Sequence, residues 1–444
     1  MQTVDTLLHA RWIIPIEPDD RVLIDHSLAI HEGRIAAILP TADARQQYRS
    51  DTELQLDKHA LIPGLINAHT HAAMSLLRGL ADDLPLMDWL QKHIWPAEGR
   101  WVSEEFVHDG SLLAIAEMLR SGTTCFNDMY FFPEVTARVA ATAGIRATVG
   151  MILIDFPSAY ASDADEYLSK GLALHDAYRS HPLIRTAFAP HAPYSVSDAP
   201  LDRVRVLADE LDVPIHMHVH ETAFEVEQSV EQCGKRPLER LQALGVVSPA
   251  LLAVHMTQLT DEEIELCAAG SVSVLHCPES NLKLASGFCP VQRLLDAGIN
   301  VALGTDGAAS NNDLDMFGEM RSAALLAKAV CGDAGAVTAY QALRMATLNG
   351  AQALGIADQT GSLIAGKWAD LCAVRLDDIE STPLYHPLSQ LVYASGRHQV
   401  SDVWVAGEHL LKERVLTSLD EADILARARQ WQVRIAAADA DANT

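Results

Sequence analysis

Two histidines that are close together in the chain indicate the clearest chemistry. His69 and His71 stand at the end of the apolar run LIPGLINAHTH, residues 61–71, with one residue between them. Side chains two positions apart in a β-strand point to the same face of a sheet, so both imidazoles can bind one metal ion. Because the chain has 19 histidines, an isolated pair can be incidental, and the prediction needs further ligands.

Other apolar runs also end in side chains that bind metals or transfer protons. They are Asp128, His191, His218, His255, His276 and Asp306. Three imidazoles and one carboxylate are a ligand set that a divalent transition metal such as Zn²⁺ accepts. The sequence therefore predicts a metal centre built from the ends of several strands.

The elements that must position these side chains repeat along the middle of the chain. Short apolar runs alternate there with helical stretches such as EEFVHDGSLLAIAEMLRSG, which is typical of βα units around a parallel sheet. The eight runs span residues 61–71, 123–129, 145–153, 184–191, 214–220, 251–256, 272–278 and 300–306. Eight βα units predict an α/β fold, a (β/α)₈ TIM-type barrel with its active site at the C-terminal ends of the strands.

Both ends of the chain have the pattern of β-structure instead. TLLHARWIIPI and SLAIHEGRIAAIL precede the barrel, and GSLIAGKWADLCAVRL and QVSDVWVAGEHLLKERVL follow it. We therefore expect residues 1–60 and 361–444 to form a composite β-sandwich with a C-terminal helix, beside a barrel of residues 61–360. Ser418 and Glu421 have the spacing of a capping box, which predicts the start of that helix.

The composition excludes several classes of protein. The 444 residues, 49% apolar and 21% charged, can bury a full core. A net charge of -26 disfavours nucleic acid and anionic membrane surfaces as partners. Seven cysteines without CxxC spacing fit a reducing compartment, and we see neither a signal peptide nor an apolar run of membrane-spanning length. These features predict a soluble cytoplasmic protein.

Several motifs give the chain a resemblance to a known family. They are NAHTH at 67–71, HMHVHET at 216–222, AVH at 253–255, HCPESNLKLASG at 276–287 and GTDGAASNN at 304–312. In this order they look like the markers of the amidohydrolase superfamily, and the resemblance covers essentially the whole chain. LRGLADDLPLMDWL at 77–90 and IWPAEGRW at 94–101 are similar to the branch that deaminates 5-methylthioadenosine and S-adenosylhomocysteine.

The resemblance implies one divalent metal ion, expected to be zinc, with Fe and Mn as alternatives because their ligand sets overlap. Its implied ligands are His69, His71, His218 and Asp306. Many relatives hold two metals bridged by a lysine of the fourth strand, but TAFAPHAPY at 186–194 contains no lysine. His216 and His220 share a strand face with His218. The family's proton shuttle follows its ligand by three positions, and Glu221 therefore selects His218.

The implied reaction is hydrolytic deamination of the 6-amino group of 5′-modified adenosines to the inosine analogue and ammonia. 5′-Methylthioadenosine and S-adenosylhomocysteine are the expected substrates, with adenosine as a further candidate. His255 and Asp306 would orient and deprotonate the attacking water. Glu221 would contact the substrate, give a proton to purine N1 and pass another to the departing ammonia.

The resemblance also implies how the nucleoside binds. Glu98 in IWPAE matches the family residue that accepts both ribose hydroxyls, and His191 would contact the purine ring. An apolar patch suited to a thioether is formed by Leu86, Met87, Trp89 and Trp95, unless these residues serve only core packing. Residues 151–167 contain four acids and neither Lys nor Arg, so the carboxylate of S-adenosylhomocysteine lacks an arginine partner there.

Other hypotheses stay open from the sequence. The same barrel and metal can act on another amino-heterocycle such as guanine, cytosine or an s-triazine, and a barrel-shaped scaffold without activity is a third possibility. A homo-oligomer, a dimer or a tetramer, is the default assembly. Asp128, His216, His220 and His276 have no role that the sequence defines.

Overall fold

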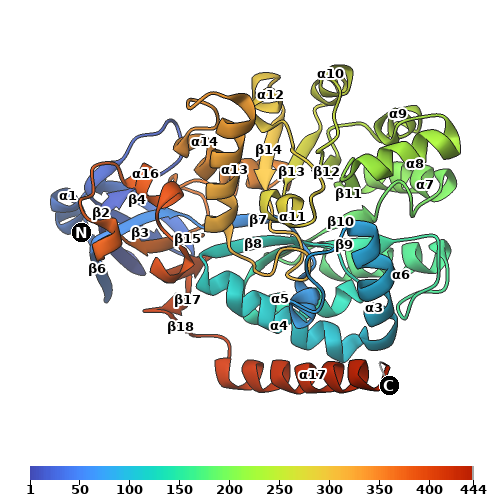
Figure 1. Ribbon diagram of the computed structural model, residues 1–444. Helices are drawn as coiled ribbons and strands as arrows, with labels where there is room; N and C mark the ends of the chain where they lie inside the picture. The colour runs from blue at the N-terminus through green and yellow to red at the C-terminus, as the bar shows by residue number, and fades with distance from the viewer. Residues whose placement is uncertain (443–444) are drawn as a thin grey trace.

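The computed structural model describes residues 1–442, and eight parallel strands form its centre (Figure 1). They are β7 (Leu65–Thr70), β8 (Thr123–Asp128), β9 (Arg146–Leu153), β10 (Ile184–Pro190), β11 (Ile215–Val219), β12 (Leu251–His255), β13 (Ser273–His276) and β14 (Asn300–Leu303). Hydrogen bonds join them in chain order from β7 to β14. The N–H of Asp306, after β14, donates to the carbonyl of His69 on β7 over 3.0 Å, which bridges the first and last strands. The predicted barrel is confirmed.

The barrel strands are buried on both faces, which explains their continuous apolar runs. Every residue of β8 and β9 is buried. Outside these strands pack α4 (Glu104–Arg120), α5 (Pro133–Ala143) and α6 (Ala164–Tyr178). The Ser103 hydroxyl starts α4 by accepting the N–H of Phe106 over 3.2 Å. The polar side chains at the strand ends are therefore exceptions in an otherwise apolar scaffold.

The sequence predicted one β-unit, a sandwich, built from both chain ends, and strands from both ends do join in a second, mixed sheet of eight strands (Figure 1). Its order is β18 (Val415–Leu416), β17 (Glu408–Lys412), β16 (Val400–Val405), β15 (Leu371–Arg375), β6 (Thr52–Pro63), β2 (Thr6–Ile13), β3 (Leu23–His31) and β4 (Arg34–Pro40). The N-terminal β6 pairs antiparallel with the C-terminal β15. Leu8, Leu28, Leu371 and Trp404 belong to a core of this sheet that is separate from the barrel core.

The junction between the two units lies inside the first apolar run. Leu61–Pro63 end strand β6 of the terminal sheet, and the barrel strand β7 begins at Leu65. A Cβ at Gly64 would lie 2.1 Å from the Thr124 hydroxyl oxygen, so only glycine lets the chain pass this close to β8. The sequence could not show this change of unit because both parts of the run are buried.

The C-terminal helix α17 (Glu421–Ala442) lies along α4. The indole N–H of Trp431 donates to Asp109 of α4 over 3.0 Å. The predicted Ser418 cap is wrong: Asp420 Oδ1 accepts the N–H groups of Ala422 and Asp423, whereas the Ser418 hydroxyl donates to the Ala143 carbonyl. Among the helices within residues 1–442, none combines the length and the apolar character needed to span a membrane.

Candidate active site

Four predicted ligands come together at the C-terminal end of the barrel, each offering one ligand atom. These atoms, from His69, His71, His218 and Asp306, all lie within 4.8 Å of one another. Asp306 Oδ1 is 3.2 Å from Nε2 of both His69 and His71, and Nε2 of His218 is 3.3 Å from Nε2 of His69. Three imidazole nitrogens and a carboxylate facing one point form a metal site suited to a divalent transition metal.

The other ring nitrogen of each histidine is held by the surrounding chain. Nδ1 of His71 donates to the Met129 carbonyl over 2.5 Å, and Nδ1 of His218 donates to the His191 carbonyl over 2.7 Å. Nδ1 of His69 lies 2.8 Å from Nε2 of His216. With Nδ1 as the donor in each bond, all three Nε2 atoms keep a lone pair for a metal.

Asp306 is fixed by several donors as well as by the histidines. Its Oδ2 accepts hydrogen bonds from the hydroxyls of Ser280 over 2.6 Å and Ser310 over 2.7 Å. Burial opposes ionisation, but the adjacent imidazoles of His69 and His71 hold the pKa of Asp306 well below its ordinary value. The backbone of Asp306 has φ 62°, a left-handed conformation that the surrounding contacts must hold for a residue other than glycine.

Two groups able to move protons stand next to the metal ligands. His255, at the end of β12, lies with Nε2 3.9 Å from Oε2 of Glu221, which follows β11. Nδ1 of His255 is 2.8 Å from the Asn281 side-chain oxygen, so Nε2 is the nitrogen that faces Glu221. Burial raises the pKa of Glu221, which favours the protonated form that a proton donor needs.

The backbone of Glu221 is held by a second buried glutamate. Glu225 accepts the N–H of Glu221 over 2.7 Å and the N–H of His220 over 3.1 Å. Burial raises the pKa of Glu225 to about 8. These bonds fix the backbone position from which the Glu221 side chain projects.

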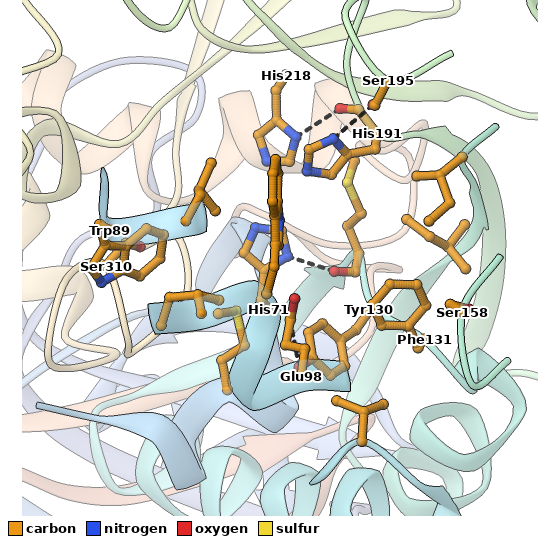
Figure 2. A pocket seen from close by; sticks show the side chains of 18 of the residues that line it. His71, Trp89, Glu98, Tyr130, Phe131, Ser158, His191, Ser195, His218 and Ser310 are labelled. Carbon is orange, nitrogen blue, oxygen red and sulfur yellow. Dashed lines mark hydrogen bonds between the residues drawn. The ribbon is translucent and has the colours of Figure 1, made fainter. Parts of the chain in front are cut away.

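A cavity of about 300 Å³ opens above the metal ligands (Figure 2). Its lining includes five predicted substrate residues, namely Trp89, Trp95, Glu98, His191 and Glu221, together with Leu86. Met87, which the sequence placed in the apolar patch, is not in the lining and packs against the core instead. Among the described residues that line the cavity, neither a lysine nor an arginine occurs.

Most of one wall comes from a lid between β7 and α4. The lid consists of α2 (Leu86–Trp89), a π-helical turn η2 (Leu90–Ile94) and α3 (Trp95–Trp101). Glu98 of α3 accepts a hydrogen bond from the Tyr130 hydroxyl over 2.8 Å, and burial raises the pKa of Glu98 to about 7. Figure 2 shows this pair facing the cavity beneath His71.

The residues without a predicted role lie around the site. Asp128 accepts the N–H of Ala72 over 2.7 Å and so fixes the chain directly after His71. His220 bonds to the backbone of Gln258 and Leu238, away from the ligands. His276 is buried at the end of β13 and does not line the cavity.

Sequence reasoning missed several residues that hold the site together. They are Tyr130, Ser195, Glu225, Ser280, Asn281 and Ser310. Ser195 lies 2.9 Å from Nδ1 of His191, its neighbour four positions earlier. Ser280 and Asn281 belong to the HCPESN motif, whose polar residues directly after a strand were the available signal. Tyr130 and Glu225 gave no comparable signal because their partners are set by packing.

Comparisons with known proteins agree with this geometry. The model of the amidohydrolase family matches residues 60–410. A protein named 5-methylthioadenosine/S-adenosylhomocysteine deaminase from Teredinibacter turnerae is 53% identical over 98% of both chains, and one of the same name from Saccharophagus degradans is 52% identical over 98% of this chain and 97% of its own. A crystal structure of an adenosine deaminase from Xanthomonas campestris with bound zinc has 58% identity and a TM-score of 0.97 over 98% of this chain and 99% of that one. The chain belongs to the amidohydrolase family.

Proposed function

We propose that this protein is a hydrolytic deaminase of 5′-modified adenosines, with 5′-methylthioadenosine and S-adenosylhomocysteine as the substrate class. One observation carries the proposal: a single cavity is lined by three of the four metal ligands, by the Glu221–His255 pair and by the lid glutamate Glu98. The similar proteins support the same activity, because they are named as deaminases of this kind and match nearly the whole chain at 52–58% identity. Zinc is the proposed metal, because the ligand set fits it and the similar Xanthomonas structure contains it.

The chain's own residues account for the steps of the reaction. A divalent ion at the site supplies Lewis acidity, which lowers the pKa of a bound water toward about 7. His255 and Asp306 orient the attacking water and accept its proton. Glu221 gives a proton to purine N1, which makes C6 electrophilic. It then takes up the second proton of the added water and passes it to the 6-amino group, and the proton held by His255 and Asp306 returns to Glu221. The C6–N bond breaks, ammonia leaves, and C6 keeps the oxygen as the inosine analogue.

The rest of the cavity selects the nucleoside. Glu98 accepts hydrogen bonds from the ribose hydroxyls, and His191 contacts the purine. Trp89 and Trp95 offer apolar contact to a 5′ methylthio group, each Å² removed from water contributing roughly 25 cal/mol. We expect 5′-methylthioadenosine to exceed adenosine in kcat/KM by about tenfold or more. The carboxylate of S-adenosylhomocysteine meets neither a lysine nor an arginine in the described lining, so we expect it to add little to kcat/KM.

A deamination screen followed by ultraviolet absorbance tests this function. The zinc-loaded protein is given 5′-methylthioadenosine, S-adenosylhomocysteine, adenosine, adenine, guanine and cytosine, with the Glu221→Gln variant as the inactive control. Turnover of the nucleosides but not of adenine supports the proposal. Turnover of a free base in preference to the nucleosides supports the alternative, an amidohydrolase acting on another amino-heterocycle.

The homo-oligomeric assembly and the cytoplasmic location remain predictions from the sequence. Light scattering of the purified protein measures the first, and fractionation of the source cells measures the second. Metal analysis of protein purified without added metal distinguishes zinc from iron and manganese.

A further inference from the structure

The lid carries much of the substrate contact but is a short, partly exposed segment. Trp89, Trp95 and Glu98 all line the cavity from it. Trp95 itself is 36% exposed, and the N–H of Trp95 bonds to the carbonyl of Leu90, the five-residue spacing of a π-turn. Such turns are often found at functional sites, and their irregular geometry needs external support. The position of Glu98 therefore depends on what fixes the lid to the barrel.

Tyr130 makes this connection from the barrel side. It follows β8, is 4% exposed and lines the cavity, and its hydroxyl donates to Oε1 of Glu98 over 2.8 Å (Figure 2). A hydrogen bond from a neutral hydroxyl to a carboxylate is stronger than one between neutral groups. A carboxylate can accept several hydrogen bonds, so Tyr130 leaves Glu98 enough capacity for a ribose diol.

The chain around Tyr130 is fixed to the metal centre. The Met129 carbonyl accepts the hydrogen bond of His71 Nδ1, and the Met129 N–H donates to the Thr70 carbonyl over 3.0 Å. Asp128 accepts the N–H of Ala72. Residues 128–130 are therefore bonded to the chain on both sides of the ligand His71. The Tyr130 hydroxyl connects this fixed segment to the lid.

From this geometry we infer that Tyr130 is a positioning residue for ribose recognition. Its hydroxyl holds the Glu98 carboxylate, and with it helix α3, in place at the wall of the cavity that the metal ligands also line. The role in ribose recognition rests on the proposed function. The contact between the lid and the barrel does not depend on it. Glu221 follows β11 and His255 ends β12, whereas Tyr130 follows β8, so removal of the hydroxyl affects recognition of the diol and leaves the chemistry at C6 intact.

The Tyr130→Phe variant tests the inference with two substrates that differ by one hydroxyl. The measured quantity is kcat/KM for adenosine divided by kcat/KM for 2′-deoxyadenosine. We expect this ratio to fall at least about fivefold in Tyr130→Phe, through KM, while kcat for 2′-deoxyadenosine stays within about twofold. Tyr340→Phe is the matched control, since it removes a phenol that donates over 2.7 Å to the Ile16 carbonyl outside the cavity.

A double variant separates positioning from general damage. If Tyr130 acts through Glu98, adding Tyr130→Phe to Glu98→Ala leaves the ratio where Glu98→Ala alone puts it, because coupled residues are not additive. An unchanged ratio in Tyr130→Phe, or an equal loss for both substrates, would overturn the inference.

Hydrogen exchange tests the contact without any substrate. We expect amides of residues 95–101 to exchange at least about threefold faster in Tyr130→Phe than in the parent protein, with no change in Tyr340→Phe. Unchanged exchange there overturns the role of Tyr130 even if the protein deaminates adenosines. Faster exchange together with failure to deaminate any nucleoside contradicts the proposed function and leaves the lid contact supported.

Discussion

Nδ1 of His69 and Nε2 of His216 lie 2.8 Å apart in the interior of the barrel. His216 therefore orients a metal ligand and is not itself a member of the ligand group. Strand β11 places His216 and His218 on one face, but His218 is one repeat nearer the rim, where the other ligands converge. His220 has left the strand and bonds to the Gln258 carbonyl. Three histidines of one motif thus have three different positions.

This arrangement predicts different effects of alanine at His218 and His216. His218→Ala removes a ligand, and we expect it to lose both metal and turnover. His216→Ala leaves the four ligands in place, and we expect metal affinity to fall about 10–100-fold, the usual effect of a lost outer partner. Elemental analysis and chelator titration measure both. Full metal occupancy in His218→Ala would falsify the ligand assignment.

Glu221→Gln should separate metal binding from proton transfer. The amide cannot carry the proton, so we expect turnover to fall by about 10²–10⁴ or more, while metal content stays at the parental level. Glu227→Gln is the matched control, since Glu227 is an exposed glutamate of the helix that follows. Parental turnover in Glu221→Gln would place the proton shuttle elsewhere.

Recognition of the ribose should depend on pH through Glu98. Burial raises the pKa of this carboxyl to about 7, so it is mostly protonated at pH 6 and mostly ionised at pH 8. Only the ionised form accepts hydrogen bonds with both oxygens, and adenosine should exceed 2′-deoxyadenosine in kcat/KM by about 30–100-fold at pH 8. We expect this ratio to decrease toward pH 6, and to be independent of pH in Glu98→Gln. The same ratio at both pH values in the parent protein would remove Glu98 from the ribose site.

The barrel and the terminal sheet are joined by a buried ion pair whose loss should be costly. Arg146 of β9 and Asp370 are 4% and 0% exposed at their side chains, and Arg146 donates to Asp370 over 2.9 and 3.2 Å. Arg146→Met leaves a buried carboxylate without its cation, and we expect the free energy of unfolding to fall by about 3–5 kcal/mol.

Chemical denaturation measures this difference, with Arg11→Met as control. Arg11 forms an exposed pair with Asp25, for which we expect about 1 kcal/mol or less. Equal effects of the two variants would mean that the buried pair contributes no more than an exposed one.

Local spacing in the sequence determined the scaffold and the reacting groups. Alternation along a strand is fixed by backbone geometry, so the HxH spacing alone places His69 and His71 on one face. Eight apolar runs fixed the barrel for a similar reason, since a parallel sheet covered on both sides requires continuous apolar strands. Because barrel strands all end at one rim, the polar residues at the strand ends could be placed beside that pair. The choice of His218 and Asp306 among them came from the resemblance to the amidohydrolase superfamily.

Tertiary structure decided which side chains support the reacting ones. Tyr130 meets Glu98 from 32 positions away, and Asn281 meets His255 from 26 positions away. These contacts depend on how a lid and a short helix pack on the barrel, and no periodicity of the chain encodes that packing. Backbone geometry repeats with every residue and can be recognised in a sequence, whereas a contact between distant segments forms only when the whole chain has folded.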